Sequence, residues 1–590
     1  MRGNFVWPGL VAALLSTCTR QVPATDEPTS PPHDAQAADA PDKPAAAPEL
    51  ARQAQAKAAA RDWAAAAALL ERAVLLNPVQ PAYWFSLATA RYQARDYKGA
   101  IRAYEKAAEL GGLPMAGPQP VVFKIACCHA LAGDKEQAIK ALERAFWLGY
   151  YIHSDMVTHP DLASVRSDPR VIELLGLKDV SKMTRDEGLR YDLAILARES
   201  HRKAFNPHLD VHRPVTRDQF DKKVRELDDA IPRLTDGQVL LGLVTLVAFL
   251  GDGHSSVWDA GANPLFRAAL PLQFFWFEEG LFVTAADTAH KDLLGARVDA
   301  FDGRPAEEVL RTMEPSVSRD RGNPMFPRAI LPFWIRRLTL LHAAGVTKSP
   351  DRVTLTVHDR SGATRDVTVA TDAKEPNIWN NLPAPASWQT FAAMLEKPPL
   401  YVRHMDRAQW FEYLPEHKLL YFQFNRTFDG RDETLARFTK RLMKFIDDHE
   451  VTKLVIDMRW NNGGNTALVQ PLLFGLIARS KVNQRGRLFA IIGRRTFSAA
   501  QNMATYLERY TEAIFVGEPT GSSPNFVGEE RPITLPYSKV VANVSHLAWQ
   551  ISWPADRRMW LAPQIYIPPT FADFSAGRDP ALDAILEYKP

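Results

Sequence analysis

The chain has 590 residues, of which 46% are hydrophobic and 24% charged, with a formal net charge of +3 at pH 7. This length favours more than one domain, and the composition is ordinary for globular protein. The small net charge does not indicate nucleic acid as a partner, and three cysteines, two of them adjacent at Cys127 and Cys128, imply no disulfide framework.

The first 18 residues have the pattern of a targeting signal. A short basic start is followed by the apolar run Phe5–Leu15, which is too short to span a bilayer, and then by Cys18. The segment 1–18 resembles a bacterial lipoprotein signal, which implies a lipid anchor at Cys18 on the periplasmic side of the cell envelope. Ordinary secretion and a chance pattern are the alternatives. We expect no other contact with a membrane.

Residues 19–48 are rich in Pro, Ala, Asp and Thr and predict a disordered linker. Residues 49–180 predict a helical repeat domain, because small and apolar residues recur with a period of 34, lengthened once by four residues. The recurring positions are Ala66, Leu70 and Ala73, then Ala100, Tyr104 and Ala107, then Ala138, Leu142 and Ala145. This pattern resembles tetratricopeptide repeats, which implies binding of a protein or peptide partner. A plain alanine-rich helical bundle is the alternative.

Residues 181–262 read as helices that end at a glycine-flanked histidine, His254. A histidine at such a helix end is exposed and positioned, although an ordinary turn residue would look the same. Residues 263–380 alternate between apolar and polar positions and predict a β-rich domain. Part of it, Leu294–Gly303, resembles the end of a PDZ-like module.

Residues 381–590 alternate predicted strands and helices, which indicates an α/β layer with mainly parallel pairing. The apolar run Phe489–Ile492 predicts a buried strand, and a helical pattern opens at Ser498. A serine at a strand-to-helix change places its hydroxyl beside unpaired N–H groups of the helix start, where a nucleophile and part of an oxyanion hole can meet. A simple helix cap is the alternative role for Ser498.

Five short segments follow one another in the last two thirds of the chain. They are the Leu-Gly-Asp-Gly-His-Ser segment at His254, the strand with Asn-Gly-Gly after Asp457, the Thr-Phe-Ser-Ala-Ala segment at Ser498, the Gly-Glu-Pro-Thr-Gly segment from Gly517, and the late Ala-Pro-Gln-Ile-Tyr-Ile segment. Together and in this order they resemble the S41 peptidases, the tail-specific protease family. The resemblance covers about residues 185–590. It implies a ClpP/crotonase-like α/β core with serine peptidase activity.

The branches of that family differ in their base. No lysine follows Ser498 at the spacing of the Ser–Lys branch, whereas His254 matches the base of the tricorn-like branch. The resemblance therefore implies Ser498 as nucleophile and His254 as base, and a histidine suits base catalysis at neutral pH. Asp556 is the carboxylate nearest to the position of the family's late glutamate, so it is the candidate third member.

Backbone N–H groups of Gly463 or Gly464 and of Ala499 are the candidate oxyanion donors, because a glycine lets the backbone approach the substrate. We expect neither metal nor other cofactor. The leading hypothesis is a serine peptidase whose repeats recruit a partner or substrate. The alternatives are a catalytically weak or inactive peptide-binding scaffold and a hydrolase of another ester or amide.

Overall fold

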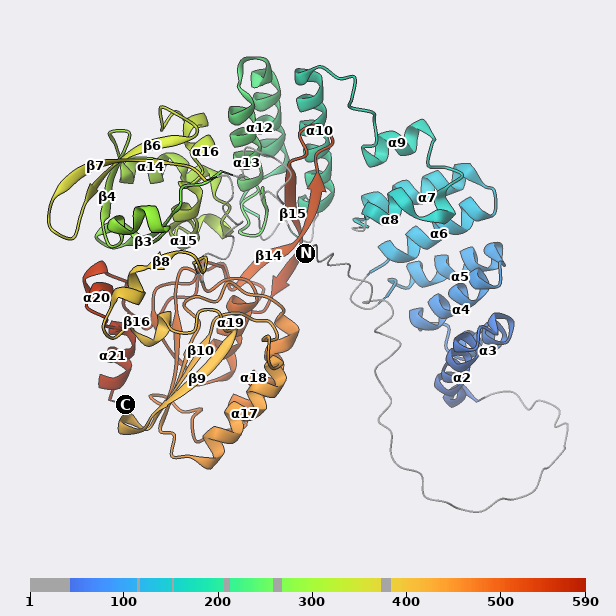
Figure 1. Ribbon diagram of the computed structural model, residues 1–590. Helices are drawn as coiled ribbons and strands as arrows, with labels where there is room; N and C mark the ends of the chain where they lie inside the picture. Colours follow the sequence, from blue (N-terminus) through green and yellow to red (C-terminus); the bar gives the residue numbers. More distant parts are fainter. Residues whose placement is uncertain are drawn as a thin grey trace. The chain divides into compact units, whose positions relative to one another are not determined.

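The computed structural model describes residues 43–113, 117–150, 153–205, 209, 213–257, 268–372 and 384–589. Residues up to Leu110 form one compact unit and residues from Gly111 onward a second (Figure 1). Within the described ranges, no helix has both the length and the apolar character needed to cross a membrane. The predicted signal with Cys18 and most of the predicted linker lie outside the described residues.

The first unit consists of helices joined by short turns: η1 (Pro44–Ala46), α2 (Ala47–Ala59), α3 (Trp63–Leu76), α4 (Pro81–Gln93) and α5 (Tyr97–Glu109). The helix α2 packs against α3, and α4 packs against α5. Asp62 and Asp96 each cap the second helix of a pair by accepting a hydrogen bond from an N–H three residues further on. Ala66 and Ala100 are fully buried at equivalent positions. Helical structure begins at Pro44, within the predicted linker.

The second unit opens with helices of the same kind: α6 (Gln119–Leu131), α7 (Lys135–Trp147), α8 (His153–Thr158), η2 (Pro160–Leu162) and α9 (Pro169–Leu175). Asp134 caps α7 as its counterparts do in the first unit. Ala138 and Ala145 of α7 are fully buried. The helical character predicted for residues 49–180 is therefore confirmed on both sides of Leu110.

Three longer helices follow: α10 (Arg185–Ala204), α12 (Arg217–Ala230) and α13 (Asp236–Ala248), with η3 (Ile231–Arg233) between the last two. Each of the three begins with a capping box, at Thr184, Thr216 and Thr235. After α13 the chain turns through Gly251–Ser255 into the short strand β1 (Ser256–Val257). This turn carries His254.

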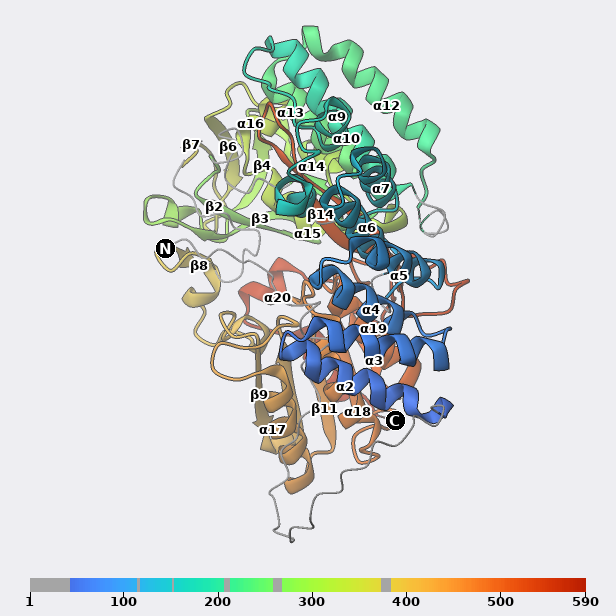
Figure 2. The same ribbon diagram turned by 90° about the vertical axis from the view of Figure 1, so that its right-hand side faces the viewer.

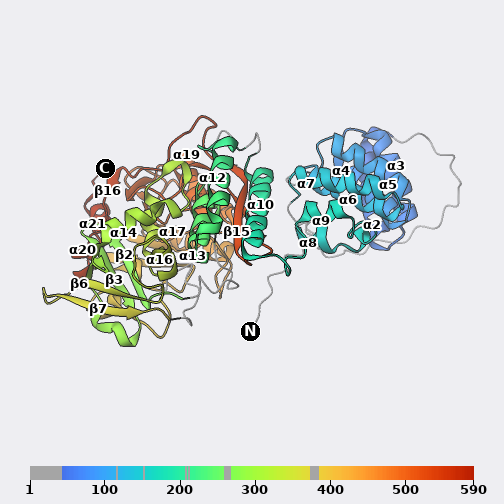
Figure 3. The same cartoon turned by 90° about the horizontal axis from the view of Figure 1, so that it is seen from above.

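The predicted β-rich region forms an antiparallel sheet in the order β2-β3-β4-β6-β7, with β5 paired to β4 and β8 to β3. The strands are β2 (Leu272–Phe277), β3 (Gly280–Ala286), β4 (Arg297–Phe301), β5 (Arg304–Pro305), β6 (Arg352–His358), β7 (Thr364–Ala370) and β8 (Gln389–Thr390). The strands β6 and β7 form an extended hairpin (Figure 3). Because β8 still pairs with β3, this sheet includes residues beyond the predicted boundary at residue 380.

Several helices interrupt that sheet: η5 (Thr288–Leu293), α14 (Ala306–Met313), η6 (Glu314–Ser316), η7 (Asp320–Gly322), α15 (Met325–Trp334) and α16 (Leu338–Ala343). Only α14 among them corresponds to a helix expected from the sequence, and that expectation, Pro305–Met313, comes from the PDZ-like resemblance. The helix α15 packs against β2, and α16 packs against α13. These contacts join the β-rich region and the preceding helices into one hydrophobic core.

The last part of the chain, after β8, is built on a sheet in the order β16-β13-β12-β11-β10-β9. Its strands are β9 (Gln409–Leu414), β10 (Leu419–Phe424), β11 (Lys453–Asp457), β12 (Leu488–Ile492), β13 (Ile514–Gly517) and β16 (Ile565–Tyr566). Pairing is parallel throughout except between β9 and β10. The prediction of a mainly parallel α/β layer is confirmed.

Helices cover both faces of this sheet. The helices α17 (Leu435–Asp448), α18 (Gln470–Ile477) and α19 (Ala499–Tyr510) share a core with one face, and α17 lies beside β9 (Figure 2). The helix α21 (Pro580–Glu587) packs on the other face. The remaining short helices are η8 (Phe391–Met394), η9 (Leu400–Val402), η10 (Pro415–His417), η11 (Thr466–Val469) and α20 (Phe571–Ser575).

A long hairpin that the sequence does not predict follows β13 and packs against the earlier elements β1 and α10. Its strands are β14 (Asn525–Thr534) and β15 (Val541–Gln550). The strand β1 pairs with β15, with Ser256 opposite Asn543 and Val257 opposite Ala542. The hairpin therefore holds the turn that carries His254 in place, although the two segments are far apart in the sequence.

Candidate active site

Ser498 occupies a strained corner between β12 and α19. Its backbone has φ 55° and ψ −125°, a conformation that L residues rarely adopt, and its hydroxyl makes no helix-capping hydrogen bond. The two residues before it are anchored to the segment after β11, because Thr496 Oγ1 donates to Met458 O (2.9 Å) and Phe497 N donates to Asn461 O (3.1 Å). Such strain persists where surrounding structure imposes it, and it is typical of functional sites. The structure therefore contradicts the alternative in which the Ser498 side chain only caps the helix α19.

Gly463 lies against this corner. A Cβ at this position would stand 2.5 Å from Ser498 Cβ and 2.9 Å from the backbone nitrogen of Ala499, and its φ is +105°. Only glycine fits such an approach. The backbone after β11 and the start of α19 are thus brought together beside Ser498.

The candidate oxyanion donors differ in availability. The N–H of Gly463 already donates to Asn461 Oδ1 (2.9 Å). Among the described hydrogen bonds, none uses the N–H of Gly464 or that of Ala499, which is the first N–H of α19. The unused N–H at a helix start favours a developing negative charge.

His254 lies between two aromatic rings. Its imidazole is 4.5 Å from the ring of Phe497 and 5.0 Å from the ring of Phe526, nearly parallel to the latter at 8°. Because Phe497 precedes Ser498, this packing brings the candidate base to the corner of the candidate nucleophile. The Nδ1 atom of His254 is buried and has no hydrogen-bond partner among the described residues.

A buried carboxylate shapes the histidine turn from within. Asp252 Oδ1 accepts from the backbone nitrogens of His254 (3.1 Å) and Ser255 (2.6 Å), and Arg213 pairs with Oδ2 at 2.6 Å. Ser545 of β15 donates to Oδ1 at 2.8 Å. Burial raises the pKa of Asp252, but Arg213 and the hydrogen bonds outweigh it and lower that pKa. The turn is therefore built around an ionised carboxylate.

A second buried carboxylate, Asp320, comes from η7 and is missing from the sequence analysis. It accepts from Gly253 N (2.7 Å), from Ser523 N (3.1 Å) and from the Ser522 hydroxyl. Burial raises the pKa of Asp320, while the charge of His254 and these hydrogen bonds oppose the rise. Asp320 thus ties the histidine turn to the loop after β13 and places a carboxylate close enough to act on an imidazolium at His254.

Asp556, the third member suggested by the resemblance, is engaged elsewhere. It accepts from Ser552 Oγ (2.6 Å) and pairs with Arg558 (2.7 Å). Burial raises its pKa, but the hydrogen bonds from Arg558 and Ser552 prevail and lower the pKa to about 2. Among the described residues, Asp556 makes no hydrogen bond with His254.

A lysine base has no support in this geometry. Lys539, the first lysine after Ser498, lies in the turn between β14 and β15. Its Nζ donates to Pro536 O (2.6 Å), and the residue is exposed.

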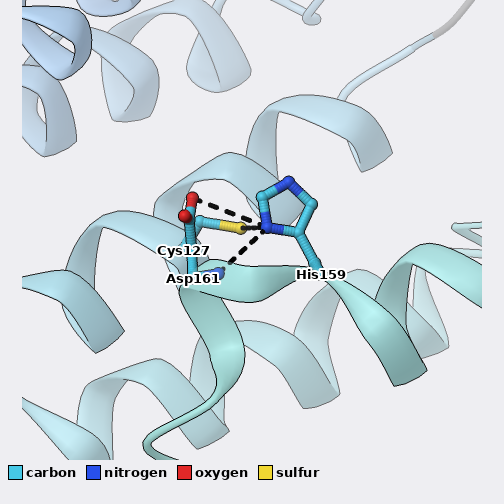
Figure 4. A group of neighbouring side chains, drawn as sticks. All are labelled: Cys127, His159 and Asp161. Atoms are coloured by element: carbon cyan, nitrogen blue, oxygen red, sulfur yellow. Dashed lines mark hydrogen bonds and ion pairs between the residues drawn. The ribbon is translucent and has the colours of Figure 1, made fainter.

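One group of side chains could supply metal ligands. Cys127 of α6 meets His159 and Asp161 at η2, with their ligand atoms within 4.8 Å of one another (Figure 4). The spacing along the sequence does not reveal this cluster, because its members come from α6 and from the start of η2. Burial raises the pKa of the Cys127 thiol to about 12, and His159 Nδ1 accepts from Asp161 N (3.4 Å). A neutral thiol and an occupied imidazole nitrogen fit a helix cap better than a metal centre.

No protein-family model matches the chain, and no curated protein matches it. Among solved structures, it is similar to mature CPAF complexed with lactacystin, with 14% identity over 68% of this chain and 98% of that chain and a TM-score of 0.48. A CPAF mutant matches with 13% identity over 69% and 99% and a TM-score of 0.48. A photosystem II D1 C-terminal processing protease matches with 11% identity over 67% and 99% and a TM-score of 0.32.

Proposed function

We propose that the chain is a serine peptidase that forms an acyl-enzyme on Ser498, with His254 as the base. The observation that carries the proposal is the strained corner at Ser498: an uncapped hydroxyl, an unused N–H at Ala499 and the close approach of Gly463. The peptide bond as substrate comes from the S41-like order of the sequence motifs.

The reaction uses these residues in two halves. Ser498 Oγ attacks the carbonyl carbon of the scissile peptide bond while His254 takes the hydroxyl proton. The N–H of Ala499, with that of Gly464, stabilises the negative charge on the carbonyl oxygen. The C–N bond then breaks, and the amine leaves with the proton from His254. Water attacks the acyl-enzyme, His254 takes its proton and returns it to Ser498, and the acid product leaves.

The relay behind the base differs from a Ser–His–carboxylate triad. In our proposal Asp320 is a positioning residue, since it binds the backbone before His254 and stabilises an imidazolium through its charge. In this proposal Asp556 orients neither Ser498 nor His254 directly.

A weakly active or inactive peptide-binding scaffold is the second candidate. The unpartnered Nδ1 of His254 favours it, because an imidazole whose second nitrogen lacks an acceptor is a less well oriented base. The test is hydrolysis of a peptide library by the full chain, followed by mass spectrometry of the products. Cleavage that disappears in Ser498→Ala supports the peptidase, whereas binding without cleavage supports the scaffold.

The helices of the first unit and the start of the second are proposed to recruit a partner, in the manner of tetratricopeptide repeats. Removing residues 43–110 should leave hydrolysis of a short peptide intact and weaken action on a folded protein. The deletion should stop at Leu110, because Arg202 of α10 donates to the carbonyl oxygens of Phe146 and Tyr150 and is itself buried. Equal loss of both activities would contradict recruitment.

The anchor at Cys18 is proposed from the signal-like sequence. Metabolic labelling with a radioactive fatty acid should mark the chain in a bacterial envelope fraction, and Cys18→Ser should abolish the label. Labelling that survives in Cys18→Ser would contradict the anchor.

A further inference from the structure

One face of the hairpin β14–β15 is turned toward His254. Phe526 of β14 stacks on the imidazole, with 5.0 Å between the ring centres, and its partner across the hairpin is Trp549 of β15. Partners across a hairpin carry their side chains on the same face, and so do residues two apart in one strand. Gly528 follows Phe526 by two residues, so it belongs to the same face as Phe526 and Trp549.

Gly528 leaves a small space on this face. A Cβ at this position would stand 3.5 Å from His254 Nε2 and 3.3 Å from Trp549 Cδ1. It would also stand 3.2 Å from Cε2 of Phe526. The φ of Gly528 is not positive, so the backbone does not require a glycine here, and a glycine within a strand often marks a close approach of another chain. The missing side chain therefore keeps open a space that the imidazole and the indole both border.

The proposed reaction uses the nitrogen of His254 that borders this space. Because Nδ1 is buried, Nε2 is the nitrogen that can exchange protons with Ser498 and with the substrate. In the acylation half of the reaction, the imidazolium gives its proton to the amine that leaves. That amine must come within about 2.6–3.2 Å of Nε2 to receive the proton. The residue that carries the amine then has its side chain beside Gly528.

Rings surround the space in front of Gly528. The side chains nearest to it are those of Phe526, Trp549 and His254, and neither Phe526 nor Trp549 carries a charge. Trp549 is only partly buried, so part of its indole is free to contact a substrate. A large apolar side chain would remove this indole surface from water, and an aromatic one would also pack favourably against the ring.

We propose that this space receives the side chain of the residue that follows the scissile bond, and that Trp549 selects a large apolar residue there, aromatic residues most of all. The inference rests on the proposed function and names its substrate class: peptide bonds whose leaving amine belongs to such a residue. A glutamine or a glycine at this position covers less of the indole, so we expect it to be a poorer leaving residue.

Transfer of an acyl group to an added amine isolates this position. The reagent p-nitrophenyl acetate acetylates Ser498 Oγ and releases p-nitrophenol, so the acetyl-enzyme forms without any residue on the leaving side. An amino-acid amide then competes with water. Its nitrogen attacks the acetyl carbon, the bond from that carbon to Oγ breaks, and His254 Nε2 takes a proton from the nitrogen and returns it to Oγ. This is the reverse of peptide-bond cleavage, so the amide occupies the place of the leaving residue.

The measurement compares phenylalaninamide, glutaminamide and glycinamide as acceptors in the same preparation of the full chain. We expect transfer to phenylalaninamide to be about tenfold faster or more than transfer to either other amide. Trp549→Ala should bring this ratio close to one, and Trp549→Phe should keep most of it. Trp147→Ala changes a tryptophan of α7 that is 50% exposed, and this matched control should keep the full ratio.

A second variant approaches the same space from the other side. Gly528→Ala fills it with a methyl group, so transfer to phenylalaninamide should fall more than transfer to glycinamide. Thermal melting shows that both variants are folded, and a ratio of two acceptors does not depend on the amount of active protein.

The outcomes separate the inference from the proposed function. Absence of any release of p-nitrophenol that depends on Ser498 would overturn the proposed function and the inference with it. Release that depends on Ser498, combined with equal transfer to the three amides or with no transfer, would overturn the inference alone. An unchanged preference in Trp549→Ala would do the same.

Discussion

The corner at Ser498 and the turn at His254 meet at Phe497, but they are held in place by different means. The corner is held by backbone: a positive φ at Ser498, a glycine packed against it and hydrogen bonds to the carbonyl oxygens of neighbouring segments. The turn is held by side chains: Asp252 and Asp320 bind its backbone N–H groups, and Phe497 and Phe526 enclose its ring.

The difference determines what each residue depends on. The nucleophile is positioned by local geometry that any L side chain at Gly463 would destroy. The base is positioned by carboxylates and rings from segments far apart in the chain. Substitutions around Ser498 should therefore act through steric fit, and substitutions around His254 through charge and orientation.

After Ser498→Ala, which should abolish cleavage, the largest effect should come from His254→Ala. Removing the base should lower turnover about a thousandfold or more, as loss of a triad member does in serine hydrolases. The control is His449→Ala, an exposed histidine on α17's C-terminal side, which should leave the rate unchanged. A mild effect of His254→Ala would mean that another group takes the proton.

The next effect should come from Gly463→Ala. The added Cβ would collide with Ser498 Cβ at 2.5 Å and disturb the N–H of Ala499, so we expect a loss of about a hundredfold in kcat. Gly303→Ala is the matched control: it also has a positive φ, +84°, but nothing lies within 4 Å of its Cβ position. Equal loss in both variants would show that backbone strain alone, rather than the approach to Ser498, matters.

Asp320→Asn should have an intermediate effect, about tenfold in kcat. The variant keeps the shape but loses the charge beside His254 and places an amide N–H₂ against donors. Thermal melting compares the stability of the variant with that of the wild type. A loss of kcat at unchanged stability supports a role in positioning His254, whereas a loss of kcat that only follows a loss of folded protein would assign Asp320 a purely structural role.

The smallest effect should come from Asp556→Asn, which should leave kcat within about twofold because Asp556 binds Ser552 and Arg558 rather than His254. It should lower the free energy of unfolding by about 1–2 kcal/mol at neutral pH. The folded-state pKa of Asp556 is lowered to about 2. Its carboxylate therefore stabilises the fold fully at pH values above its pKa in the unfolded chain, and this stabilisation is lost as the pH falls through about 2. Denaturation at pH 7 and at pH 2 measures the loss of stability in the variant and its dependence on pH. A large loss of kcat would instead show that Asp556 acts on His254 during the reaction.

The parts predicted from sequence are those that depend on neighbours in the chain. The strand Lys453–Asp457, the helix after Ser498 and the glycine turn follow from short apolar runs and glycines. The parts not predicted depend on distant contacts. Asp320 binds Gly253 and Ser522, 67 and 202 residues away, and no local pattern marks it.

The hairpin β14–β15 was missed for a physical reason. Its first strand contains Pro532, has a positive φ at Glu529, and begins with four consecutive buried residues, so buried and exposed residues do not alternate along it. Packing against β1 and the histidine turn, rather than its own sequence pattern, fixes this hairpin. Its contribution of Phe526 to the site could not be derived without the structure.

The measurement that tests the central claim most directly is labelling of the full chain with a fluorophosphonate, followed by mass mapping of the modified peptide. Such reagents react with an activated serine hydroxyl and leave a stable adduct on it. A single adduct on Ser498, absent from Ser498→Ala and strongly reduced in His254→Ala, is the predicted result. Labelling at another serine, or no labelling of a folded preparation, would contradict the assignment of Ser498 as the nucleophile.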